Sequence, residues 1–374
     1  MESLVSNRIT LFTGNFSGSN TVALYKFLKS NQNIFDVKLI IRSGNNSLEE
    51  LEFIKTSRFL IYTAYYPIKY SDGQIVIQTW HGFPLKTLGV LNQNDCLRDN
   101  GIYVDYLARS DIVLSYSKTY QTFYNACFPT FASKYYITGM PRNDFLFLPF
   151  ERVKENLERI FGICKSSEKF ILFSPTYKLS GYRGDDYLQT SYFEYLDQIF
   201  SDEFISFLDE INSVLFLKLH PVEERFLESS GLIKKIFQSV MNRQRIFLIK
   251  DEDLKRNFTD LYELLPCFDL LITDYSSIAY DWLLTDKPVV NYIPDRELYK
   301  KQRNFLVEPL ELWVPGAIAK NVHELQREIQ NSLSDKNYQK NKRELLKRIV
   351  HHYMDSKSSE RVFNLIRSIY EQIG

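Results

Sequence analysis

Two adjacent serines, Ser276 and Ser277, stand between an apolar run at residues 270–273 and an amphipathic run at residues 278–284. The apolar run is typical of a strand buried on both faces, and the amphipathic run has the spacing of a helix. The first turn of a helix leaves backbone N–H groups unpaired at the positive end of its dipole, and two hydroxyls there add donors. This segment is therefore a candidate phosphate-binding site. The alternative is that one serine is an ordinary N-cap and that nothing binds.

Two of the five histidines, His81 and His220, each follow an apolar strand and stand next to Gly or Pro. An unperturbed imidazole has a pKa of about 6.5, which suits proton transfer at neutral pH. The alternative for each is a packed histidine with a satisfied hydrogen bond, but two of them at strand ends in different halves of the chain favour a function. We expect His351 and His352 to be solvated on a basic helix and His323 to lie at the surface.

Further donors and positive charges follow other predicted strands of the second half. Thr176 follows the strand at residues 170–173, and Lys218 comes two residues before His220, so both side chains leave the same face of a strand. Arg303 lies beyond the last predicted strand. Fixed donors of this kind stabilise a phosphate electrostatically, and no P-loop lysine spacing is present, so neither a metal nor another cofactor is implied. For Lys218 and Arg303 the alternative is an ordinary surface charge.

The composition excludes several classes of protein. Lys+Arg and Asp+Glu both number 46, and a net charge of zero argues against a protein that coats nucleic acid. The four cysteines form no CxxC pair, so neither a zinc site nor a disulfide framework is indicated. No apolar signal core begins the sequence, and no run approaches the roughly 20 apolar residues of a membrane span. We expect a cytoplasmic protein.

Short apolar runs alternate with amphipathic runs along the chain, which predicts α/β domains with parallel sheets covered on both sides. A charged helical stretch at residues 151–167 divides the pattern into two doubly wound, Rossmann-type domains, residues 1–150 and 168–374, with a cleft between them. The predicted strands cover residues 9–13, 37–41, 59–63, 74–79, 112–116, 135–138, 170–173, 214–219, 246–249, 270–273 and 288–292.

Polar residues collect at the predicted strand ends of both domains, where open α/β sheets bind their ligands. In the first domain these are His81 and the pair Arg142 and Asn143, and in the second they include Asp274. The first strand is followed by a turn of small residues at 14–20, which lacks the GxGxxG pattern of a dinucleotide site.

Several short segments occur in the order seen in one enzyme family and together span residues 78–316. They resemble the signatures of the CDP-glycerol glycerophosphotransferases, the primases and polymerases of teichoic-acid synthesis. Two positions depart from the family pattern, Phe83 after Trp-His-Gly and Ala317 in the late Pro-Gly turn. The segments are Trp80-His81-Gly82-Phe83-Pro84-Leu85-Lys86, Gly139-Met140-Pro141-Arg142-Asn143-Asp144, Pro175-Thr176-Tyr177, Leu219-His220-Pro221, Thr273-Asp274-Tyr275-Ser276-Ser277 and Pro315-Gly316.

The resemblance implies a GT-B fold, a CDP-linked donor, no required metal and peripheral attachment at the inner face of the cell membrane. It implies transfer of glycerol phosphate from CDP-glycerol to a hydroxyl of a lipid-linked saccharide or polyol-phosphate acceptor, with release of CMP. His81 would take the proton of that hydroxyl, and His220 would stabilise charge. The diphosphate would be bound by Thr176, Lys218, His220, Ser276, Ser277 and Arg303, and substrate binding would extend to Arg142 and Asn143.

Alternatives remain open at this point. Asp274 and Asp281 can orient His220 or a donor hydroxyl, or can simply cap helices. CDP-ribitol is the close competitor of CDP-glycerol as donor. A GT-B glycosyltransferase that uses a nucleotide sugar, or a non-catalytic binding module, would share the fold. The basic stretch at residues 336–348 can contact anionic lipid or can be a solvated helix face.

Overall fold

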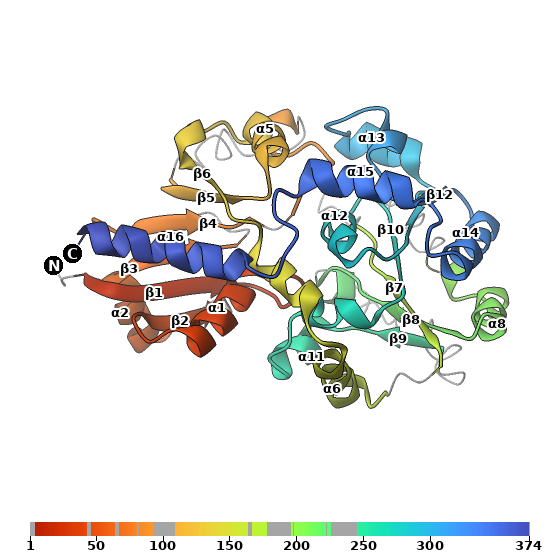
Figure 1. Ribbon diagram of the computed structural model, residues 1–374, viewed down its shortest axis with the longest axis horizontal. Coiled ribbons are helices and arrows are strands. Elements are labelled where there is room, and N and C mark those ends of the chain that lie inside the picture. Colours follow the sequence, from red (N-terminus) through yellow and green to blue (C-terminus); the bar gives the residue numbers. More distant parts are fainter. Residues whose placement is uncertain are drawn as a thin grey trace.

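The computed structural model describes residues 4–42, 46–63, 67–80, 82–92, 109–163, 167–177, 196, 198–221, 223–225 and 245–373. Two lobes, each built on a parallel sheet with helices on its faces, lie side by side (Figure 1). This arrangement confirms the two predicted α/β domains. His81 lies outside the described residues, as does all but the last residue of a helix that the sequence predicts at residues 103–109.

The first sheet has the strand order β2-β1-β3-β4-β5-β6, and all of its pairs are parallel. Its strands are apolar on both faces, as expected for a sheet covered by helices on each side. The described helices of this lobe are α1 (Asn20–Asn31), α2 (Leu48–Thr56) and α5 (Lys118–Cys127). The strands are β1 (Val5–Thr13), β2 (Asp36–Ile41), β3 (Ser57–Tyr62), β4 (Ile75–Gln78), β5 (Ile112–Ser115) and β6 (Tyr135–Ile137).

The second sheet has the order β12-β11-β10-β7-β8-β9, again with parallel pairs. Its last strand, β12 (Ala317–Ala319), was not predicted, because three apolar residues, Ala-Ile-Ala, make too short a run to indicate a strand. The other strands are β7 (Lys169–Phe173), β8 (Ser213–Leu217), β9 (Ile246–Leu248), β10 (Leu270–Thr273) and β11 (Val289–Tyr292). Its helices are α6 (Phe150–Phe161), α8 (Asp202–Glu210), α11 (Asp251–Arg256), α12 (Ile278–Trp282), α13 (Arg296–Arg303), α14 (Val322–Ser334) and α15 (Lys340–Val350).

The last helix, α16 (Ser358–Ile373), leaves the second lobe and packs on the first sheet, where it brings the two termini to the same end of the molecule (Figure 1). Val362 and Ile366 are fully buried in the core of the first domain. Asp144 caps this helix, because its carboxylate accepts from the backbone N–H groups of Ser358 and Ser359 at 2.8 and 2.7 Å. The predicted boundary at 168–374 is thus corrected: the apolar stripe of the final helix belongs to the first domain.

His351, at the end of α15, is a second correction. It was expected to be solvated but is only 3% exposed, and its Nε2 lies 2.8 Å from the Tyr280 carbonyl oxygen. His352 and His323 are exposed, as expected. In the part of the chain that the structure describes, no helix has the length and apolar character needed to cross a bilayer.

Candidate active site

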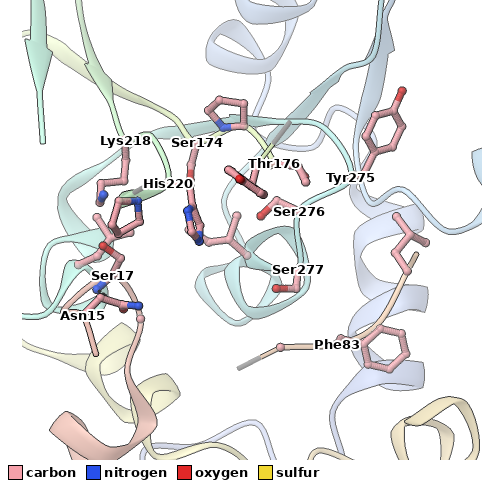
Figure 2. A pocket seen from close by; sticks show the side chains of 18 of the residues that line it. Asn15, Ser17, Phe83, Ser174, Thr176, Lys218, His220, Tyr275, Ser276 and Ser277 are labelled. Atoms are coloured by element: carbon pink, nitrogen blue, oxygen red, sulfur yellow. Dashed lines mark hydrogen bonds between the residues drawn. The ribbon is translucent and has the colours of Figure 1, made fainter. Parts of the chain in front are cut away.

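A cavity of about 410 Å³ lies between the two domains. Most of its wall is made by the loops that follow three neighbouring strands in each sheet, β1, β3 and β4 on one side and β7, β8 and β10 on the other. Arg142, Leu261 and Tyr262 complete it. This is the edge at which open α/β sheets bind ligands. Figure 2 shows side chains from both domains around this space.

The segments after β7 and β10 place three predicted hydroxyl residues, Thr176, Ser276 and Ser277, in the cavity wall (Figure 2). The Thr176 side chain is 4% exposed, and its Oγ1 has no hydrogen-bond partner among the residues that the structure describes. Ser277 precedes α12 but makes no side-chain capping bond, so the alternative of an ordinary N-cap is wrong for it. These hydroxyls are available to a ligand.

Asp274 holds the two segments of this wall together through hydrogen bonds to their backbone. Its Oδ1 accepts from the backbone N–H of Thr176 at 2.8 Å and from that of Tyr275 at 2.6 Å. The carboxylate therefore joins the loop after β7 to the loop after β10. It orients the hydroxyl-bearing backbone and caps no regular helix.

Lys218 lines the cavity, but its ammonium forms an ion pair with Glu224 and donates to the Leu219 carbonyl oxygen at 2.6 Å. The side chain is only 2% exposed, so the alternative of a surface charge is wrong. Glu224 in turn accepts from the backbone N–H of Asp251 at 3.0 Å. Contrary to the expectation of a charge free to meet phosphate, this lysine fixes the loop after β8.

His220 faces the cavity, and its ring lies 4.8 Å from that of Tyr177. Surrounding protein displaces water from the imidazole, and the cations Lys218, Lys86 and Arg225 add repulsion, which together lower the pKa of His220 to about 4. Solvent still reaches the ring through the open cavity. With this lowered pKa the imidazole is neutral at pH 7, so in the ligand-free protein it can stabilise a charged ligand by a hydrogen bond.

Arg142 and Asp281 form a buried ion pair across the domain boundary, at 2.5 Å. The guanidinium also donates to the Gly18 carbonyl oxygen at 2.8 Å and to the Tyr116 hydroxyl at 3.2 Å, and the Tyr262 hydroxyl donates to Asp281 at 2.6 Å. Asp281 is not among the described residues that line the cavity with His220: its Oδ2 is bound by Arg142 and Tyr262, and its Oδ1 has no described partner. Arg142 still lines the cavity.

Two other predicted residues lie away from the cavity lining. Asn143 is 2% exposed and points into protein, and Arg303, the last residue of α13, is half-buried. The Arg303 backbone carbonyl accepts a hydrogen bond from the Thr87 hydroxyl across the domain boundary. Neither side chain is among those that line the space between the domains.

Gly82 brings the two domains into contact. A Cβ added at Gly82 would lie 2.5 Å from the Ser277 Cβ and closer still to its Oγ, and the glycine has a φ of +155°. Gly82 of the first domain therefore lies against Ser277 of the second. Only a residue without a side chain permits this approach.

The sequence analysis missed three residues that build this region, Tyr262, Asp260 and Asp251. Asp260 accepts from the backbone N–H groups of Gly18 and Ser19 at 3.2 and 2.8 Å, across the domain boundary. A local signal existed, since Asp260 and Glu263 form a capping box. Nothing in the sequence indicates the partner in the first domain.

The described lining of the cavity contains Lys86, Arg142, Lys218 and His220 but neither Asp nor Glu. No group of three metal-ligating side chains occurs among the described residues. The site is therefore suited to a phosphorylated ligand that is bound by hydroxyls, amides and cations.

Comparisons with known proteins agree with this geometry. Residues 17–368 match the family model described as CDP-Glycerol:Poly(glycerophosphate) glycerophosphotransferase. The chain is 28% identical to the teichoic acid ribitol-phosphate polymerase TarL of Staphylococcus aureus over 85% of this chain and 51% of that protein. It is 25% identical to a teichoic acid poly(glycerol phosphate) polymerase of Bacillus spizizenii over 84% of this chain and 80% of that protein. The chain spans about half the length of the ribitol-phosphate polymerases it matches.

A solved structure of the wall teichoic acid polymerase TagF superposes with a TM-score of 0.73 and 21% identity, over 99% of this chain and 90% of that one. This likeness confirms the predicted GT-B-like fold, two Rossmann-type domains facing a cleft.

Proposed function

Since the chain belongs to the CDP-glycerol:poly(glycerophosphate) glycerophosphotransferase family, we propose that it transfers glycerol phosphate from CDP-glycerol to an acceptor hydroxyl and releases CMP. The observation that carries the proposal is the cavity wall, where the hydroxyls of Thr176, Ser276 and Ser277 and the imidazole of His220 converge at the carboxyl ends of β7, β8 and β10 and the described lining has no carboxylate. The acceptor is a lipid-linked saccharide or a polyol phosphate, and the polymer is a teichoic acid or a related surface polymer.

The second domain binds the diphosphate of the donor. Thr176, Ser276 and Ser277 donate hydroxyl hydrogen bonds to its oxygens, and the neutral imidazole of His220 adds another. Such donors are fixed in place before the reaction, which is how a site stabilises charge that develops at phosphorus without a metal.

The acceptor oxygen attacks the phosphorus that carries glycerol, and the bond from that phosphorus to the CMP oxygen breaks. The proton of the acceptor hydroxyl goes to His81, whose neighbours Trp80 and Gly82 line the first-domain wall. CMP leaves as a phosphate monoester with a second pKa of about 6, so no strong general acid is needed. His81→Ala is expected to abolish turnover and to retain donor binding; near wild-type turnover would disprove the role.

Ribitol phosphate is the second candidate for the transferred group. TarL and TarK are named as ribitol-phosphate polymerases, and both match more than four-fifths of this chain. A glycosyl group from a nucleotide sugar is the third, since the GT-B fold alone does not separate these donors.

One assay separates the three. Purified protein is offered CDP-glycerol, CDP-ribitol or a UDP-sugar, each with a polyol-phosphate acceptor, and the release of CMP or UDP is measured. CMP release with CDP-glycerol at a kcat/KM at least tenfold above that with CDP-ribitol supports the proposal. The opposite ratio would mean that ribitol phosphate is the transferred group. Release of UDP would contradict the proposed phosphotransferase activity.

Membrane contact at the inner face of the cell is the remaining part of the proposal, through the basic stretch at residues 336–348. Arg343 and Lys347 are engaged within the protein, by the Tyr338 carbonyl oxygen and by Asp286 respectively. Lys336, Lys340 and Arg348 are exposed, and so is Leu345, at 59% exposure. These three cations are expected to bind anionic vesicles, each contributing about 1 kcal/mol. Equal sedimentation with anionic and neutral vesicles, or no effect of reversing the three charges, would remove this contact.

A further inference from the structure

The loop after β1, residues 14–18, is a turn of small residues. It has no role in the proposed binding of the diphosphate. Asn15, Ser17 and Gly18 line the first-domain wall of the cavity. In Figure 2, Asn15 and Ser17 lie on the same side of the cavity as Lys218 and His220, away from Ser276 and Ser277. The loop belongs to the first domain, the side of the cavity that the proposed reaction gives to the acceptor.

The second domain fixes this loop in one position. Asp251 accepts from the backbone N–H of Phe16 at 2.9 Å and from the Ser17 hydroxyl at 2.7 Å. The Leu261 backbone N–H donates to the Phe16 carbonyl oxygen at 2.7 Å, and the Phe16 ring is fully buried in a core that the second domain dominates. A wall that is fixed by such contacts is preorganised for recognition.

Asn15 is the residue of this loop with donors to spare. Its Oδ1 accepts from the Ser17 backbone N–H at 3.1 Å, which turns the Nδ2 group the other way. That Nδ2 has no hydrogen-bond partner in the described part of the chain, and the side chain is half-buried in the cavity wall. An amide N–H₂ group donates two hydrogen bonds, and hydroxyl and phosphodiester oxygens are matching acceptors.

We infer that the loop at residues 14–18 recognises the polyol-phosphate end of the acceptor, with the Asn15 amide as its hydrogen-bonding group and Asp251 as the residue that positions it. This inference rests on the proposed function and adds the residues that bind the acceptor. Asn15 belongs to the domain that carries His81, the residue proposed to take the acceptor's proton, and this assigns Asn15 to the acceptor and not to the donor.

Two substitutions separate recognition from structure. Asn15→Ala removes the donors, and Asn15→Asp retains the oxygen that accepts from Ser17 but replaces the N–H₂ with a charged oxygen. We expect the acceptor KM to rise about tenfold in the first variant and further in the second, where the carboxylate repels phosphate, with the KM for the CDP-polyol within twofold of wild type. Asn31→Ala, at the exposed end of α1, is the control and keeps both constants. An Asn15→Asp variant with wild-type acceptor KM would show a purely structural role and overturn the inference.

Calorimetric binding of a soluble tri(glycerol phosphate) and a tri(ribitol phosphate) to the wild-type chain and both variants keeps the test independent of turnover. Weaker binding of either probe by the variants supports the inference, whether or not a CDP-polyol is turned over. A lack of turnover would refute only the proposed reaction. Unchanged binding by the variants, or no binding of either probe to the wild type, overturns the inference. Asp251→Asn is expected to weaken the same binding by a smaller factor.

Discussion

Arg142 of the first domain and Asp281 of the second form an ion pair at 2.5 Å in which the two side chains are 3% and 0% exposed. The pair lies beside the cavity, and its partners Tyr116, Tyr262 and Gly18 come from three other segments. A charge pair in this position sets the relative placement of the two walls. The ion pair therefore holds the two domains together, and its Arg142 side chain also lines the cavity.

Breaking this pair from one side is expected to destabilise the protein strongly. Arg142→Met leaves a buried carboxylate uncompensated, and Asp281→Leu leaves a buried guanidinium, each lowering the free energy of unfolding by roughly 3–5 kcal/mol. The double variant removes both charges and is expected to lose less than the sum of the two. Chemical denaturation of the four proteins measures this, and additive losses would show that the two charges are not coupled.

The sequence indicated the strands and the residues at their ends because both follow from local pattern. A strand buried on both faces reads as an apolar run, as β8 and β10 do, and parallel topology then places their carboxyl ends at one edge. That reasoning brought Thr176, His220 and Ser277 together correctly.

Most of the errors arose where a partner far along the chain decides the environment. Asp281 meets Arg142, which lies 139 positions away. The burial of His351 and the return of α16 to the first domain depend on tertiary packing in the same way. Spacing in the sequence carries no record of such contacts. The error at Lys218, which was expected to be free for phosphate, is local instead, because its partner Glu224 lies only six positions further along the chain.

Thr176→Val is expected to separate stability from function. The threonine hydroxyl is buried without a described partner, so an isosteric methyl group should raise the free energy of unfolding by about 1 kcal/mol. Affinity for the CDP-linked donor should fall about tenfold, because the diphosphate loses a donor. Calorimetric binding of CDP and thermal unfolding measure the two effects.

The control is Thr273→Val, the same substitution at a buried threonine whose hydroxyl donates to the Ser174 carbonyl oxygen at 2.6 Å. This variant should lose stability, since a satisfied hydrogen bond is removed. If Thr176→Val loses as much, the Thr176 hydroxyl has a structural partner and the assignment to the donor is wrong.

Gly82→Ala is expected to force the two domains apart. The added methyl group would overlap Ser277. The backbone φ of Gly82, +155°, is also one that residues with a side chain rarely adopt. Overpacking and strain together should lower the free energy of unfolding by about 2–4 kcal/mol. Ser277→Gly in the same chain should restore part of that loss, since it removes the atoms that clash.

Gly162→Ala supplies the matched comparison, because that glycine has a φ of +66° and no atom within 4 Å of an added methyl group. It should lose only about 1 kcal/mol from backbone conformation. Equal losses at the two glycines would mean that Ser277 does not limit the approach at Gly82.

His351 is expected to make stability depend on pH. Burial lowers the pKa of this imidazole below its usual value, with Lys347 adding repulsion, while Asp281 and the Tyr280 carbonyl oxygen oppose the shift only in part. The ring of Tyr116, 5.5 Å away, completes its surroundings. A histidine whose pKa is lower in the folded state binds a proton more readily when unfolded. The free energy of unfolding should therefore fall as the pH is lowered through about 6.5.

His351→Gln retains a donor for the Tyr280 carbonyl oxygen but cannot be protonated, so its unfolding free energy should decline less between pH 7.5 and 5.5 than that of the wild type. His323→Gln changes a side chain that is 76% exposed and should leave the wild-type decline unaltered. Urea titrations of the three proteins at several pH values measure the slopes. Parallel slopes for the wild type and His351→Gln would show that the buried imidazole accepts a proton as easily in the folded protein as in the unfolded chain.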